Sequence, residues 1–309
     1  MAIQIKKPAF AHETPIISEI FDILNNFLLD PSLDCAPCAN KLTELFTPFL
    51  DTFERTDAVG YLWGTLFWIV KQVPPSHEYQ VRLVSLVLSI RDVEPPAGEG
   101  PDAYEEVTGE RFWTGLPFVR KMWADYEDEA PLVPPMDERP DSFPKTESMT
   151  SPGPWLTRLT GQDWTNLQAF SARLHASSDL PFLDLRGLFA LLEALEREQD
   201  AATLDNLVPA AACWILYAGS KLRNNSIPYP PYDFEDHVKR VPWSVGELYH
   251  GKKGFNAERW EFWWLRFGIM KDCGDLKVET RQWAEEAQRK MAEIQNQESA
   301  KVIEEALPV

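Results

Sequence analysis

Arg173 and Tyr217 are the residues whose types best suit chemistry, because each can donate a hydrogen bond from an apolar stretch of sequence. Arg173 stands in the string FSARL, and Tyr217 in the uncharged string CWILYAGS. A guanidinium or phenol that donates to a carbonyl oxygen stabilises negative charge developing there. We therefore expect both residues to be catalytic donors. The structural alternative is a salt bridge from Arg173 to Glu193 or Glu196 on the following helix.

Tryptophan is the most unusual component, with 12 copies in 309 residues. Aromatic side chains at helical spacing usually pack in a core, but they also line apolar ligand cavities. The uncharged run 207–220 predicts a helix that is buried on all sides, with Trp214 and Tyr217 inside the protein. On the cavity interpretation, the substrate-binding walls are Trp63, Trp164, Trp214, Trp260 and Trp264.

Other catalytic motifs are incomplete. Cys35 and Cys38 have redox-motif spacing but no strand–helix–strand pattern around them, so we expect a structural role. His175 shows no metal-ligand spacing, and we expect it to be a surface or hydrogen-bonded histidine. The acidic segments 125–129 and 233–236 lack the aspartate pattern with which terpene cyclases bind magnesium. The sequence thus predicts a protein without metal or cofactor.

The elements that would position these residues are helices. Apolar residues recur at helical spacing along most of the chain, and no convincing run of alternating strand residues occurs. A short turn at residues 73–75 predicts that the helices before and after it form an antiparallel hairpin. We expect helices over residues 15–28, 39–53, 57–72, 76–90, 116–129, 161–176, 182–198, 204–223, 256–271 and 278–305.

The fold class expected from this pattern is all-α, with two helical lobes packed into one body. Residues 92–154 differ from the rest because they are acidic and rich in proline, which breaks helices. We therefore expect an N-terminal lobe over 1–129, a proline-rich connector or lid over 130–154, and a C-terminal lobe over 155–309.

Charge and targeting signals narrow the class of protein. With 48 acidic and 30 basic residues, the formal net charge is −18, which disfavours binding to nucleic acid or to an anionic membrane. The first apolar stretch carries Glu19 and Asp22, unlike a signal peptide, and no uncharged run reaches the ~20 residues of a membrane helix. Four cysteines make no disulfide scaffold, so we expect a cytoplasmic protein.

Several ordered strings resemble a filamentous-fungal family catalogued as a domain of unknown function. They are WTNLQAFSARL, LFALLEALE, AACWILYAGSKL, ERWEFWWLRF and TRQWAEEAQRKM, and the stretch from FERTDAVGYLWG to VRLVSLVLSI resembles it too. The resemblance covers most of residues 40–295 and is least close over 92–154. It implies a link to specialised-metabolite pathways and to cofactor-free cyclisation of the Diels–Alder type, but it transfers no catalytic residue.

Two classes of function follow, and the first is favoured. A cofactor-independent intramolecular pericyclase would fold an apolar fungal terpenoid or polyketide between aromatic walls, with Arg173 or Tyr217 as the donor to its carbonyl. The alternative is a non-catalytic helical scaffold or regulatory interaction protein, in which the aromatic residues are only core. A carrier of an apolar metabolite is a third interpretation. The sequence is also compatible with a homo-oligomer.

Overall fold

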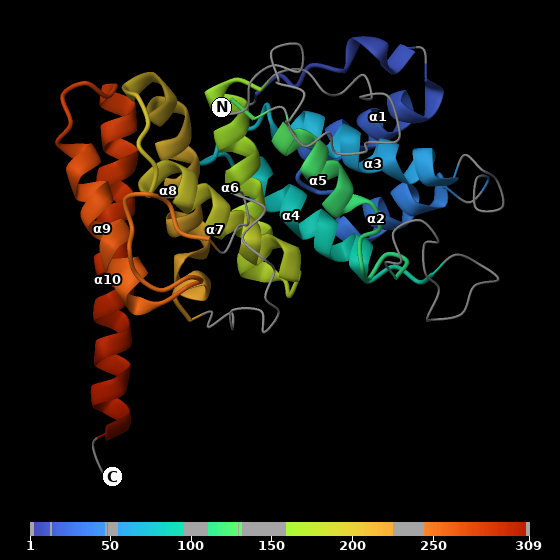
Figure 1. Ribbon diagram of the computed structural model, residues 1–309. Helices are drawn as coiled ribbons and strands as arrows, with labels where there is room; N and C mark the ends of the chain where they lie inside the picture. The colour runs from blue at the N-terminus through green and yellow to red at the C-terminus, as the bar shows by residue number, and fades with distance from the viewer. Residues whose placement is uncertain are drawn as a thin grey trace. The chain divides into compact units, whose positions relative to one another are not determined.

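The structure of the protein is a computed structural model that describes residues 3–12, 14–46, 48, 55–95, 111–128, 130–131, 159–224 and 244–306. Over these ranges the chain forms ten α-helices and one 3-10 helix, with no β-strand, which confirms the predicted all-α fold (Figure 1). The chain divides into two compact units, Met1–Phe170 (unit 1) and Ser171–Val309 (unit 2). The division falls inside helix α6, while most of the expected connector, 130–154, lies outside the described residues.

Unit 1 contains a helix in each segment where apolar periodicity predicts one, but the helix expected over 39–53 ends at Glu44 and the helix expected from residue 116 begins at Val119. Helix α1 begins with Pro15 in its first turn, where a missing N–H leaves no bond unmade. Helix α2 begins at Cys35 rather than at residue 39, because Pro37 is tolerated in the first turn as well. The described elements are η1 (Ala9–His12), α1 (Pro15–Leu29), α2 (Cys35–Glu44), α3 (Arg55–Val70), α4 (Glu78–Arg91), α5 (Val119–Asp128) and α6 (Gly161–Ser177), which continues into unit 2.

The predicted hairpin of α3 and α4 is wrong as a packing arrangement. Helix α3 packs mainly on α1 and α5, whereas α4 packs mainly on α2. The Gln80 side chain, on α4, links the turn between α3 and α4 to α6. Its amide donates to the carbonyl oxygens of Val73 in the turn (2.8 Å) and of Asn166 on α6 (3.1 Å). A short turn limits how far apart two helix ends lie, but the apolar faces of the helices decide which neighbours they pack against.

Unit 2 matches the sequence-based helices to within three residues at each end. Helix α8 packs on α7 and α10, and α9 packs on α10 and α7 (Figure 1). The uncharged run 207–220 is buried over most of its length, but Tyr217 is half-buried and Ser220 is exposed, so it is not buried on all sides. The helices are α7 (Pro181–Leu195), α8 (Ala201–Asn224), α9 (Ala257–Lys271) and α10 (Val278–Ala306).

Helix α8 is the one described helix that is long and apolar enough to cross a membrane, judged by length and composition alone. Just over half of its most apolar window is buried inside the structure. The buried part of α8 packs against α7 and α10.

Helices α7 and α8 approach closely at Gly187. A Cβ atom at this position would lie 2.8 Å from Cε3 of the Trp214 ring, which is fully buried. The missing side chain of Gly187 therefore makes room for the indole ring, and the interior is packed too densely to accept another carbon without displacement.

We expect Gly187→Ala to lower the free energy of unfolding by about 1–2 kcal/mol, because overpacking outweighs the better helix propensity of alanine. Urea denaturation followed by circular dichroism measures the change. Gly274→Ala is the matched control, because no heavy atom lies within 4 Å of its Cβ position. Equal stability of the two variants would show that Trp214 has room to move.

Candidate functional site

The two predicted donors, Arg173 on α6 and Tyr217 on α8, lie in direct contact in unit 2. The Arg173 guanidinium carbon stacks 3.4 Å from the centroid of the Tyr217 ring, which is cation–π geometry. Both side chains are half-buried. Burial, followed by the neighbouring Cys213 thiol, raises the pKa of the Tyr217 hydroxyl, although Arg173 acts in the opposite direction. Tyr217 therefore keeps its proton at neutral pH and can donate a hydrogen bond.

The predicted walls in unit 2 face three different surroundings. Trp214 is buried against Gly187 and the His175 ring, whose centroid lies 5.8 Å away. Trp260 is also buried, 3.7 Å from the Cβ position of Gly219, and its indole N–H has no hydrogen-bond partner among the described residues. Trp264 is 37% exposed on α9. Each indole thus contacts its own set of neighbours, and Trp264 faces solvent.

The predicted walls in unit 1, Trp63 and Trp164, are packed into the core of that unit. Trp63 is fully buried, and its indole N–H donates to the carbonyl oxygen of Pro117 at 2.6 Å. Trp164 stacks on Trp123 with ring centroids 6.3 Å apart, and Trp123 meets Phe67 edge to face. These contacts are those of an aromatic core, where ring pairs contribute beyond their buried area.

Two of the surface grooves are lined by described residues alone, and neither of these two contains a predicted wall. One, of about 470 Å³, lies beside α1 in unit 1 and is lined in part by Glu19, Asp22 and Lys41. The other, of about 310 Å³, lies between the end of α9 and the start of α10, where Arg281 and Glu285 contribute. Their charged linings suit polar ligands rather than an apolar terpenoid or polyketide.

Cys35 and Cys38 are free thiols in the first turn of α2. Burial, followed by the neighbouring Cys35, raises the pKa of the Cys38 thiol to about 11. A redox-active or nucleophilic cysteine needs the opposite shift, toward the thiolate. In the described part of the chain, no three His, Cys, Asp or Glu side chains gather as a metal site would require.

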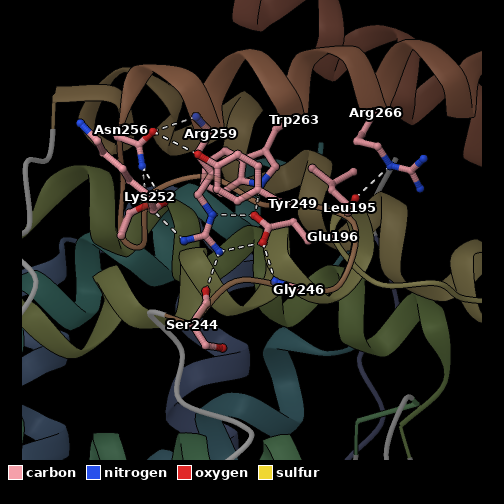
Figure 2. Close-up of polar contacts among 11 residues, drawn as sticks. Leu195, Glu196, Ser244, Gly246, Tyr249, Lys252, Asn256, Arg259, Trp263 and Arg266 are labelled. Carbon is pink, nitrogen blue, oxygen red and sulfur yellow. Dashed lines mark hydrogen bonds and ion pairs between the residues drawn. The ribbon is translucent and has the colours of Figure 1, made fainter. Parts of the chain in front are cut away.

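The strongest polar cluster of unit 2 is one that sequence reasoning missed (Figure 2). Glu196, directly after α7, and Arg259, in the first turn of α9, form a buried, bidentate ion pair with N–O distances of 2.6 and 2.9 Å. The Trp263 indole N–H donates to the same carboxylate at 2.6 Å, and the Gly246 backbone N–H donates at 3.0 Å. We call this set the Glu196 cluster.

Arg259 is equally well satisfied. Two more of its N–H groups, on Nη1 and Nη2, donate to the carbonyl oxygens of Gly254 (3.1 Å) and Ser244 (2.8 Å) (Figure 2). A Cβ atom at position 246 would overlap the Glu196 carbonyl oxygen, so only glycine brings its N–H this close. With four donors on one carboxylate, the cluster has no group left for a substrate, and its role is to hold α7, α9 and the 244–256 segment together.

The predicted salt bridge between Arg173 and Glu196 is therefore wrong. Glu196 binds Arg259 instead, 63 residues further along the chain. Glu193 accepts a hydrogen bond from Arg197 at 2.7 Å. The single sequence signal for the cluster was Asn256, whose side chain accepts from the Arg259 backbone N–H as a helix N-cap. That signal marks where α9 starts but not what its arginine binds.

His175 is neither at the surface nor hydrogen-bonded through its ring, contrary to expectation. The residue is 1% exposed, and neither ring nitrogen makes a hydrogen bond among the described residues. Asp184 of α7 lies 3.5 Å from Nε2, and Lys221 of α8 donates to the His175 carbonyl oxygen at 2.8 Å. Burial, followed by the charge of Lys221, lowers the pKa of His175 to about 4.

We expect Glu196→Gln to reduce the free energy of unfolding by about 3–5 kcal/mol, because it leaves the Arg259 charge buried without a counter-charge. Glu293→Gln is the control, since its pair with Arg289 is exposed and should contribute less than about 0.5 kcal/mol. Chemical denaturation of both variants measures the difference, and a loss of similar size in both would contradict a structural role for the cluster.

His175 should make unit 2 less stable in acid. Its pKa is 6.5 when unfolded and about 4 when folded, so the unfolded chain binds the proton more readily between these values. Stability contributed by the neutral ring is complete above pH 6.5 and falls as pH drops toward 4, by up to about 3 kcal/mol. Denaturation measured at each pH should show that the free energy of unfolding falls less with acid in His175→Leu than in the wild type. An equal fall in both proteins would contradict the low pKa of His175.

Comparison with known proteins identifies the family but not an activity. A family model described as "Protein of unknown function (DUF3632)" matches residues 63–267, about two thirds of the chain, from α3 into α9. No curated protein and no solved structure matches the chain. The fungal origin and the link to cyclisation that the resemblance implied stay predictions. The chain therefore belongs to the DUF3632 family of proteins of unknown function.

Proposed function

We propose that the protein is a helical interaction protein that presents the outer side of α9 to a partner. The observation that carries the proposal is the exposure of three large apolar side chains on one helix: Trp264 (37%), Leu265 (56%) and Ile269 (58%). Single exposed apolar residues are ordinary, but a group of them on a folded protein marks an interaction surface. An indole at such a surface is also a frequent anchor of binding energy.

The inner side of α9 is fixed, which makes the outer side a rigid surface. Arg259 and Trp263 bind Glu196, and Arg266 donates to the carbonyl oxygen of Leu195 at 2.9 Å (Figure 2). Phe267 and Met270 are buried. A helix held at this many points loses little further entropy when a partner binds, which favours affinity.

The positions of the other tryptophans also support an interaction role. Trp63, Trp164 and Trp214 are at most 1% exposed and pack on neighbours of their own unit. In an interaction protein of this kind, these three tryptophans stabilise the two units and take no part in binding. Four free thiols and an acidic composition suit a cytoplasmic protein, which is where we place it.

The proposal is tested by protein capture from a lysate of the source organism, with the purified full-length chain as bait. We expect proteins retained by the wild type to be lost from the double variant Leu265→Ser/Ile269→Ser. Val81→Ser on α4 is the matched control, because Val81 is as exposed (56%) but lies in unit 1. Retention of the same proteins by the double variant would overturn the proposal.

A second candidate is cofactor-free cyclisation at the Arg173–Tyr217 pair. The direct contact of these two half-buried donors favours it, together with the protonated state of Tyr217. The pair would donate to a carbonyl oxygen of an apolar terpenoid or polyketide and stabilise the charge that develops there. It would act by orientation and hydrogen bonding, with no covalent intermediate.

Turnover of an apolar metabolite extract tests this second candidate. Native mass spectrometry would detect a retained compound, and chromatography would detect a product of unchanged mass. Tyr217→Phe should remove the product while leaving the fold intact, since the cation–π stack needs only the ring. Retention without an isomer would indicate a carrier, and the absence of both signals from the folded protein would reject cyclisation.

A further inference from the structure

We infer that the outer side of α9 binds a basic amphipathic helix of another protein, an inference that rests on the proposed function. We define the α9 face as the apolar group Trp264, Leu265 and Ile269 together with the carboxylates at its two ends. Those carboxylates are Glu258, Glu261 and Asp272, the last at the C-cap.

Helical spacing places five of these residues in one band, with Trp264 about 100° to one side of it. Glu258, Glu261, Leu265, Ile269 and Asp272 are separated by three or four residues each, so their side chains follow one another along the same side of the helix. All five are exposed. The band runs about 21 Å along the axis, the length of four helical turns. A partner helix of that length would match it turn by turn.

The exposed charges that α9 and its C-cap carry are of one sign. Every charged side chain that is exposed on α9 or at its C-cap is acidic, namely Glu258, Glu261 and Asp272. The cations of α9 are engaged or withdrawn: Arg259 is buried on Glu196, and Arg266 is half-buried with a bond to the Leu195 carbonyl. Lys271 is half-buried in the groove beside α10.

An apolar centre with acidic ends is complementary to an apolar stripe with basic ends. Apolar anchors at positions i, i+3 or i+4 and i+7 of the partner would contact Leu265 and Ile269, with Trp264 at the edge of the contact. Lysine or arginine at the partner's ends would meet the carboxylates and raise the rate of association. The net charge of −18 attracts the same kind of partner over longer distances.

A second copy of the chain is a poorer occupant. It would bring three more carboxylates and another net charge of −18 to the interface, so that like charges approach one another. The acidic ends of the face thus act against self-association while they attract a basic partner.

The test is fluorescence anisotropy of the full-length protein with a labelled synthetic peptide of about 18 residues. The peptide carries leucines at i, i+3/i+4 spacing and lysines at both ends, and its matched control has glutamate at every lysine position. We expect the lysine peptide to bind at least about tenfold more tightly than the glutamate peptide. Raising the salt from about 50 mM to about 300 mM should weaken the affinity for the lysine peptide severalfold.

Two variants separate the apolar from the charged contribution. Leu265→Ser/Ile269→Ser should weaken binding of the lysine peptide at least about tenfold, and Glu261→Gln/Asp272→Asn should reduce the salt dependence of that binding. Val81→Ser in unit 1 should bind as the wild type does. Equal affinity for both peptides, unchanged affinity in the double serine variant, or no binding at about 100 µM would overturn the inference.

Failure of this inference is distinguishable from failure of the proposed function. If lysate proteins depend on Leu265 and Ile269 but the lysine peptide does not bind, α9 is an interaction surface for a partner of different chemistry. If sedimentation shows a dimer that the double serine variant disperses, a second copy covers the face, and the basic-helix inference is wrong.

Discussion

The buried ion pair of Glu196 and Arg259 is the constraint on which the rest of unit 2 depends. Taking both charges out of water costs several kcal/mol, and only close, complete hydrogen bonding offsets that cost. The cluster meets this condition, because the carboxylate accepts from Arg259, Trp263 and Gly246 and the guanidinium also binds two backbone carbonyls. Such a pair stabilises only one arrangement of its three segments, and any displacement leaves a charge without a partner.

That arrangement fixes the rotation of α9 about its axis. Trp263 points at Glu196 and is buried, so Trp264, one residue further on, must lie about 100° around the helix and reach the surface. Leu265 follows it outward, and Phe267 returns to the interior. The exposed apolar group is therefore a consequence of where the Glu196 cluster holds the helix, and the proposed interaction surface is as rigid as the buried ion pair makes it.

Local signals in the sequence predicted the helices well, but they could not predict long-range partners. Helices α7 to α10 were located closely because their apolar spacing, caps and breaking prolines lie within each segment. Glu196 could not be paired correctly, since Arg259 is 63 residues away and Arg173 was an equally good cation by sequence. For the same reason, three adjacent aromatic residues in ERWEFWWLRF gave no sign that Trp263 is buried and Trp264 exposed.

The same physical argument weighs the two candidate functions against each other. A pericyclase needs aromatic rings that face a substrate, yet the rings of Trp63, Trp164 and Trp214 are covered by protein, and reaching them would require opening a densely packed interior. The α9 face needs no such rearrangement, because its apolar side chains are already in water and gain free energy whenever a partner covers them. In the proposed interaction role, carboxylates at both ends select the partner, and the strong acidity of the chain is part of that specificity.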